Sequence, residues 1–195
     1  MSIGLNTYFF LVACVAAQRL LELRVASRNT EELLAMGAQE HESRHYTAMR
    51  LLHGAWLLAC LAEAAWRGLP ASAFLSVPAL VLFGVGQALR VAAIKELGTR
   101  WTTRIIVLRE APPVAGGIYR HIKHPNYLGV ILELAALPLV FGCWFTAVAF
   151  SIANLALLLG VRIPAEEAAL KAAVPSLELA KWARTSRFIP GRSST

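Results

Sequence analysis

Two short polar segments of the sequence carry residue types that could bind a charged ligand. One is His124-Pro125-Asn126-Tyr127, and the other is the run Arg162–Glu167, which reads RIPAEE. Proline is favoured in the first turn of a helix, because it lacks the N–H group that would stay unpaired there. We therefore expect a helix to begin at about His124–Pro125. The free N–H groups and positive dipole end of such a helix favour an anion such as a carboxylate or phosphate.

The second segment places a cation and a carboxylate one helical turn apart. Arg162 and Glu166 share a helix face if the helix continues through Pro164, where a kink is expected. Each segment also has a purely structural interpretation. The first, with its basic and aromatic neighbours, could anchor a helix at the lipid headgroups, and the second could form an ion pair at a helix end.

The composition indicates which elements position these segments. Of the 195 residues, 57% are hydrophobic and 16% charged, whereas a soluble domain is about 45–50% apolar and about 25% charged. The chain is therefore expected to be an all-α integral membrane protein, with one domain over residues 1–195. Its apolar stretches predict five membrane helices, at 3–23, 46–66, 74–94, 127–141 and 145–163.

The last two stretches are separated only by Phe141-Gly142-Cys143-Trp144, which predicts a tight antiparallel hairpin. Such a hairpin returns both polar segments to the same level of the membrane. Glu133 follows Asn126 by seven residues, so it lies about two turns deeper on the same helix face. Because a carboxyl group is costly within a bilayer, Glu133 is expected to face the protein interior.

Charge placement predicts the orientation and excludes several functions. The chain has 19 Lys+Arg and a net charge of +7. Most basic residues lie in segments 24–45, 95–126 and 162–195, so the positive-inside rule places these in the cytoplasm and the N-terminus outside. The basic residues do not follow a nucleic-acid-binding pattern. The absence of aspartate and the wide spacing of the three cysteines argue against Asp-based phosphate chemistry and a zinc or redox motif.

The run VAGGIYRHIKHPNYLG (114–129), followed by RIPAEEAAL (162–170), resembles the isoprenylcysteine carboxyl methyltransferase family. The resemblance implies a multi-helix enzyme of the endoplasmic reticulum or prokaryotic inner membrane. Such an enzyme transfers a methyl group from S-adenosylmethionine to a lipophilic acceptor without a metal. Residues 1–95 would form three N-terminal helices, and 96–195 the cofactor-binding catalytic half. The implied cofactor-binding residues are Pro113, Val114, Tyr119, His124, Pro125, Asn126, Tyr127, Glu166 and Glu167.

The resemblance also suggests which groups act on the acceptor. Arg162 resembles the arginine that positions the acceptor, and Glu166 the carboxylate that completes the pocket. The family's C-terminal Phe-Gly-x-x-Tyr-x-x-Tyr pattern is absent from segment 174–183. With Arg100–Thr103 upstream, the chain is more similar to bacterial relatives that O-methylate long-chain alkylpyrones or alkylresorcinols. A phenol or enol acceptor benefits from a base, for which Glu133 and His124 are candidates.

Three other functions remain open at this stage. An NADPH-dependent sterol-type reductase has a similar helical hairpin, but would need further basic contacts for a 2′-phosphate. A phospholipid N-methyltransferase would use the same cofactor on an amine. A membrane scaffold or transporter would bind no cofactor.

Overall fold

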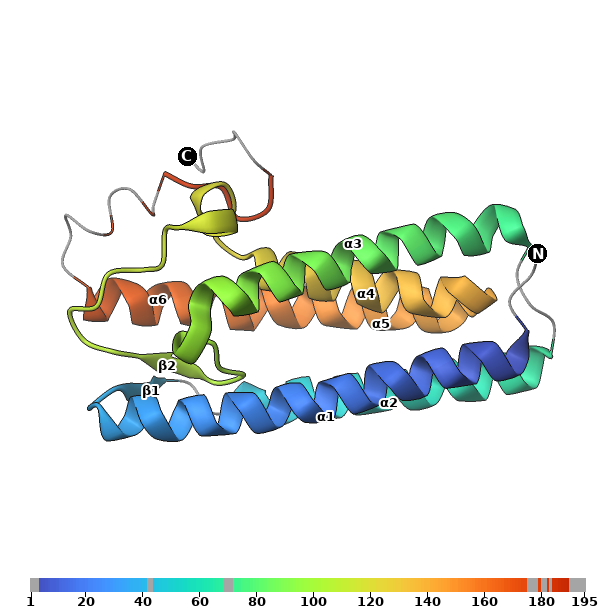
Figure 1. The fold of residues 1–195 in the computed structure, drawn as a ribbon, viewed down its shortest axis with the longest axis horizontal. Coiled ribbons are helices and arrows are strands. Elements are labelled where there is room, and N and C mark those ends of the chain that lie inside the picture. Colours follow the sequence, from blue (N-terminus) through green and yellow to red (C-terminus); the bar gives the residue numbers. More distant parts are fainter. Residues whose placement is uncertain are drawn as a thin grey trace.

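The computed structural model describes residues 4–41, 44–68, 72–174, 179, 182 and 184–189. Long helices dominate the fold (Figure 1). In chain order the elements are α1 (Leu5–Ala35), β1 (Gln39–His41), α2 (Arg44–Arg67), α3 (Ala73–Leu97), β2 (Ile105–Val107), α4 (Pro125–Phe141), α5 (Trp144–Leu157) and α6 (Ile163–Ala173).

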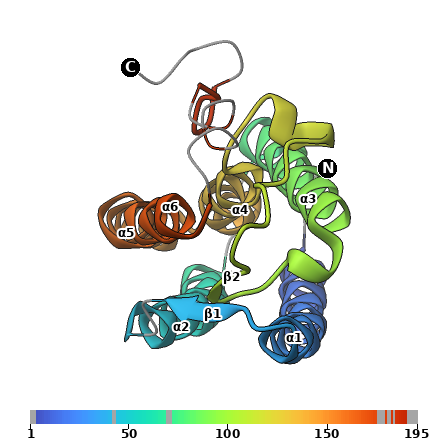
Figure 2. The same ribbon diagram turned by 90° about the vertical axis from the view of Figure 1, so that its left-hand side faces the viewer.

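The protein is an all-α integral membrane protein. Among the described residues, three helical segments are long and apolar enough to cross a membrane, at Tyr46–Arg67, Ala73–Arg100 and Trp144–Ala173, and Pro125–Phe141 is a shorter apolar helix. Viewed along the helices, α3, α4 and the α5–α6 rod form one layer, and α1 and α2 form a second (Figure 2). Strand β2 lies between the two layers at the end that carries α6.

Helix α1 is longer than the apolar stretch at 3–23 predicts, because it continues to Ala35. Its second half is rich in arginine, glutamate and leucine, which are strong helix formers. The end of the hydrophobic run is therefore not the end of the helix. After α1, strand β1 pairs antiparallel with β2, with Gln39 opposite Val107. Three-residue strands are too short to leave a recognisable pattern in the sequence.

A two-residue turn separates α4 from α5. Helix α4 ends at Phe141, and the φ of 84° at the following Gly142 lies in the left-handed region that glycine adopts without strain. The N–H of Cys143 then donates to the carbonyl of Pro138 at 2.9 Å. Glu63 of α2 accepts the free N–H groups of the first α5 turn, from Phe145 at 3.2 Å and Thr146 at 2.7 Å.

A π-helical turn, Leu158–Arg162, joins α5 to α6. Pro164 follows this turn, and a proline ring clashes with the carbonyl four residues earlier in a regular α-helix. The wider π-helical turn is one way to accommodate the proline ring, and the kink expected at Pro164 stays a prediction. The same turn directs Arg162 into the protein, where only 5% of the residue is exposed.

The two ends of the bundle differ in their packing. The closed end is a buried apolar cluster centred on Tyr8, Trp56, Cys60, Leu137 and Phe141. The rings of Tyr8 and Phe141 stack there at 5.1 Å. The opposite end, called the cavity end below, carries α6, the β1–β2 sheet and the start of α4, and it contains the polar segments that the sequence singles out.

Candidate active site

Helix α4 begins at Pro125, as the sequence predicts. The backbone just before it is held by the C-terminal segment. The N–H of Lys123 donates to the carbonyl of Ser186 at 2.8 Å, and the N–H of His124 donates to that of Arg187 at 3.2 Å. The tail therefore lies along the start of α4.

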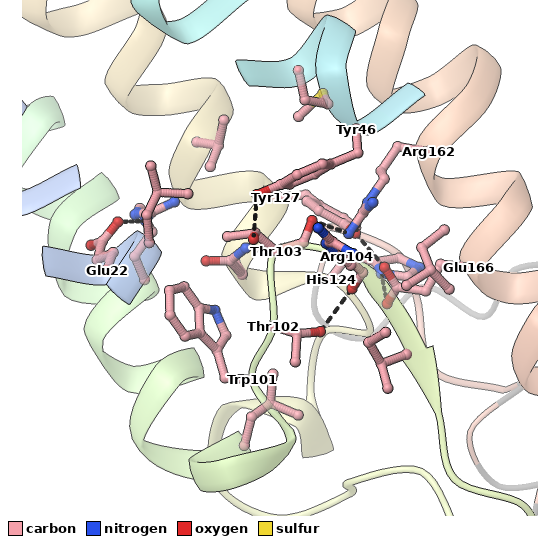
Figure 3. Close-up of a pocket in the computed structure, with 18 of the residues that line it drawn as sticks. Glu22, Tyr46, Trp101, Thr102, Thr103, Arg104, His124, Tyr127, Arg162 and Glu166 are labelled. Atoms are coloured by element: carbon pink, nitrogen blue, oxygen red, sulfur yellow. Dashed lines mark hydrogen bonds and ion pairs between the residues drawn. The ribbon is translucent and has the colours of Figure 1, made fainter. Parts of the chain in front are cut away.

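Arg162, Tyr127 and Glu166 form a connected group at the cavity end (Figure 3). The Nε of Arg162 donates to the Tyr127 hydroxyl at 2.9 Å, and that hydroxyl donates to the Glu166 carboxylate. The second arm of the guanidinium donates to the carbonyl of Thr103 at 2.9 Å. The hairpin and the π-helical turn thus bring together the two polar segments, which are 35 residues apart at their closest pair.

His124 lies between two carboxylates. Its Nε2 is 3.1 Å from Oε1 of Glu167, and its Nδ1 is 3.7 Å from Oε1 of Glu166. Arg187 binds both oxygens of Glu167, at 2.9 and 2.7 Å, and this hydrogen bonding raises the pKa of Arg187. Since Glu167 accepts from Arg187 as a carboxylate, it favours a proton on the facing Nε2 of His124. In a neutral ring with this proton, the Nδ1 is the nitrogen that can accept one.

A cavity of about 730 Å³ opens beside these groups, a volume within the usual range for small-molecule sites. Many predicted residues line it: Pro113, Val114, Tyr119, His124, Asn126, Tyr127, Arg162 and Glu166. Three predicted residues, Pro125, Glu167 and Glu133, are not part of its wall. Pro125 starts α4, and Glu167 is behind His124.

Tyr119 reaches the cavity from a 3₁₀ turn at Gly117–Arg120. Burial raises the pKa of its phenol, so the group remains a neutral hydroxyl. Gly117 has a φ of 48°, and a Cβ there would lie 2.3 Å from a carboxylate oxygen of Glu96. The glycine pair at 116–117 therefore permits a turn that a side chain would prevent.

Glu133 belongs to a buried ion network that joins three helices. It is fully buried and pairs with Arg19 of α1, and its other oxygen is 3.4 Å from Nε of Arg90 in α3. Glu22 pairs with the same two arginines, at 2.6 Å from Arg19. These ion pairs give Glu133 a structural role, because they join α4 to α1 and α3. Its role as a base stays a prediction.

Several residues of the cavity wall were not found from the sequence. The guanidinium groups of Arg50 and Arg104 both lie near the ring of Tyr46, at 5.6 and 5.2 Å from its centre. Trp182 of the tail packs edge-on against His124, and the ammonium group of Lys123 lies 4.7 Å from the centre of the Trp182 ring. Burial lowers the pKa of Lys123. Arg19 and Glu22 could have been recognised from the sequence, because they are two charged residues, three positions apart, in an apolar helix.

The chain is also similar in sequence to known proteins. Residues 79–172 match the isoprenylcysteine carboxyl methyltransferase (ICMT) family. The chain is 36% identical to the uncharacterized protein YpbQ of Bacillus subtilis over 165 residues, covering 84% of this chain and 96% of that protein. It is 30% identical to an uncharacterized protein of Haemophilus influenzae, covering 84% and 94%. Most of segment 174–183, where the family pattern departs, lies outside the described residues.

Proposed function

Since this chain belongs to the isoprenylcysteine carboxyl methyltransferase family, a family of membrane methyltransferases, we propose that it transfers a methyl group from S-adenosylmethionine to an oxygen of a lipophilic acceptor. The observation that carries this proposal is the cavity. Its wall includes Tyr119, Asn126, Tyr127, Arg162 and Glu166, which the family resemblance assigns to the cofactor and the acceptor.

The polar groups at the start of α4 fit such a cofactor. The Oδ1 atom of Asn126 is buried and has no hydrogen-bond partner in the described part of the chain. An unpaired buried oxygen is costly, so this atom favours a ligand with an N–H or ammonium donor. Tyr119 offers an aromatic face to a sulfonium or an adenine. Glu166 can accept from hydroxyl groups.

In this proposal, residues 96–195 hold the cofactor, and helices α1 and α2 complete the wall on the acceptor side. S-adenosylmethionine, when bound, supplies a methyl group on a sulfonium, and in-line displacement by the acceptor oxygen leaves a neutral thioether. Arg162 holds the Tyr127 hydroxyl and so fixes the wall next to the reacting atoms. The remaining task of the protein is alignment and exclusion of water.

A phenol or enol acceptor must also lose a proton. We assign this proton to His124 Nδ1 rather than to Glu133, because His124 lines the cavity and Glu133 is held by Arg19 and Arg90. The imidazolium that forms lies between Glu166 and Glu167, and both carboxylates stabilise its charge. Long-chain alkylpyrones and alkylresorcinols are the acceptors that this chemistry favours.

The charge distribution supports an orientation with the N-terminus outside and the cavity end in the cytoplasm. The two relatives named above come from bacteria, which supports the prokaryotic inner membrane as the location. The cofactor would then enter from the cytosol, and the acceptor from the bilayer.

The first test is calorimetry on the purified protein in nanodiscs. We expect S-adenosylmethionine and its demethylated product to bind, and NADPH not to bind. Transfer of labelled methyl groups to a membrane lipid extract should then yield a methyl ether, identified by mass spectrometry. Failure to bind the cofactor would defeat the proposal, tight NADPH binding would favour a reductase, and a methylated amine would favour a phospholipid N-methyltransferase.

The chain offers a matched pair of histidines for the base. His121 is exposed, whereas His124, three residues later, is 3% exposed at the cavity. We expect His124→Gln to slow transfer to a phenol about a hundredfold, within the usual contribution of general base catalysis. His121→Gln should leave transfer unchanged. Equal rates in the two variants would exclude His124 as the base.

A further inference from the structure

The C-terminal segment places Arg187 beside the start of α4, and the mechanism proposed above does not use this residue. The carbonyl of Arg187 accepts the N–H of His124 at 3.2 Å. The next residue, Phe188, packs against a buried apolar cluster that contains Tyr127. The backbone of Arg187 is therefore held against the first turn of α4, which fixes where its side chain begins.

The guanidinium of Arg187 binds the carboxylate that contacts His124. Its Nε and Nη2 donate to the two oxygens of Glu167, at 2.9 and 2.7 Å, and Oε1 of the same carboxylate is 3.1 Å from Nε2 of His124. A bidentate pair of this kind fixes the direction of the carboxylate as well as lowering its energy. Arg187 therefore holds Glu167 in place against the imidazole ring.

His124 faces a carboxylate at each of its ring nitrogens. Glu167 approaches Nε2 at 3.1 Å, and Glu166 approaches Nδ1 at 3.7 Å, which is too long for a hydrogen bond. A nearby carboxylate favours the protonated, positively charged ring. An imidazolium has no free nitrogen to receive a proton from the acceptor. Without counter-charges, the two carboxylates would therefore act against His124 as a base.

Each of the two carboxylates has its own guanidinium group. Glu166 accepts from the Tyr127 hydroxyl, which in turn accepts from Nε of Arg162 at 2.9 Å. Glu167 accepts from Arg187 directly, and because its side chain is only 11% exposed, water screens this pair in part. Within the described part of the chain, the charged or titratable groups that face the His124 ring come from α6 (Glu166, Glu167), the π-helical turn (Arg162), the tail (Arg187) and the start of α4 (Lys123, Tyr127).

We propose that Arg187 controls the proton on His124 through Glu167. It holds the carboxylate on Nε2 and offsets the negative charge, so that the ring is neutral at the pH of the cytosol and can receive the proton that a phenol or enol acceptor loses. The inference rests on the proposed function, because His124 is the base of that reaction. Arg187 is a positioning residue: it acts on the ring through Glu167 and takes no part in the proton transfer itself.

Two substitutions in one ion pair test the inference, because they should have opposite effects. Arg187→Gln leaves the charge of Glu167 without its guanidinium, so His124 should keep its proton up to a pH about half a unit higher. Glu167→Gln removes the negative charge, so His124 should lose its proton at a pH about one unit lower. A purely structural role of the pair would not produce opposite shifts. In the double variant, Arg187→Gln should add little to the effect of Glu167→Gln, since its action requires the carboxylate.

The proton on His124 is followed by NMR of the protein in nanodiscs, with a nitrogen isotope label in its histidines. The signal of His124 is identified by its loss in His124→Gln, and this measurement requires no methyl transfer. The pH dependence of the transfer rate is then measured on the same variants. Because only the neutral ring acts as a base, the acid limb of the rate profile should move with the NMR midpoint in each variant.

Two further variants are matched controls. Arg187→Lys keeps the positive charge but loses the bidentate geometry, so its NMR midpoint should lie closer to that of the unaltered protein than the midpoint of Arg187→Gln does. Arg184 is an exposed arginine three residues earlier in the same segment. Arg184→Gln should leave both the midpoint and the transfer rate unchanged.

The outcomes distinguish this inference from the proposed function. An unmoved midpoint in Arg187→Gln, a move to lower pH, or an equal shift in the absence of the Glu167 carboxylate would overturn the inference. Opposite shifts in the two single variants support it. If the NMR midpoints shift and the acid limb of methyl transfer does not, the result contradicts His124 as the base in the proposed function, while control of its proton by Arg187 stands.

Discussion

The closed end and the cavity end are built from the same helices but are stabilised by different interactions. At the closed end, Tyr8, Trp56 and Phe141 are fully buried among apolar neighbours, and the indole N–H of Trp56 donates to the carbonyl of Leu134 at 3.2 Å. At the cavity end, buried cations and carboxylates surround a space of about 730 Å³. Apolar packing therefore dominates the closed end, whereas the groups that could do chemistry lie at the cavity end.

The buried ion network marks the boundary between these regions. Glu133 lies one turn before Leu137, which belongs to the closed-end core, while its partners Arg19 and Arg90 line the cavity. A network that contacts both regions couples them. Substitutions there are expected to change stability and activity together, whereas substitutions on either side should change only one of them.

The largest effect is expected from Glu133→Gln. The substitution leaves two arginines with a single carboxylate, and breaking a buried pair on one side costs about 3–5 kcal/mol. Thermal unfolding in detergent micelles measures the loss. The double variant Glu133→Gln, Arg19→Gln restores neutrality and should recover part of the stability. A loss below about 1 kcal/mol in the single variant would show that the network is not a stabilising link.

The next effect concerns activity alone. Arg162→Ala removes the donor to the Tyr127 hydroxyl and to Thr103 at the cavity wall. We expect transfer to fall on the order of a hundredfold, about 2.7 kcal/mol of transition-state stabilisation. The melting temperature should change little, because the cavity lets water replace the lost guanidinium. A stability loss comparable with that of Glu133→Gln would mean that the cavity end also supports the fold.

The surroundings of Arg162 and Glu133 show which contacts the sequence could predict and which it could not. Proline chemistry predicted the start of α4 at about His124–Pro125, and the short break at Phe141–Trp144 predicted the meeting of the two polar segments. The pairing of Arg19 with Glu133 spans 114 residues. No helical period relates positions so far apart, so only the packing of α1 beside α4 reveals the pair. Local signals fix local structure, and partners between helices depend on the assembled bundle.

A third substitution probes the contact between α3 and α4. A Cβ at Gly129 would lie 2.6 Å from Cγ of Arg90 and 2.7 Å from the backbone oxygen of Gly86. Gly129→Ala therefore forces the helices apart, and overpacking of this kind costs about 1–3 kcal/mol. Gly84→Ala, on the same helix as Gly86 but with open space around it, is the control and should be neutral or slightly stabilising. Thermal unfolding compares the two, and an equally stable Gly129→Ala would contradict the close approach.

The smallest effect is expected at the closed end, from Glu63→Gln. The Glu63 carboxylate accepts the N–H groups of Phe145 and Thr146 and the Thr146 hydroxyl, at 3.2, 2.7 and 2.7 Å. Glutamine keeps one accepting oxygen but loses the negative charge at the positive end of α5, so unfolding should become easier by about 1 kcal/mol. Thr146→Val removes only the hydroxyl donor and should cost less.

Because Glu63 contacts no residue of the cavity wall through these bonds, both variants should transfer methyl groups at the unaltered rate per folded molecule. A reduced rate in a fully folded Glu63→Gln sample would show that the start of α5 is coupled through the α5–α6 rod to Arg162.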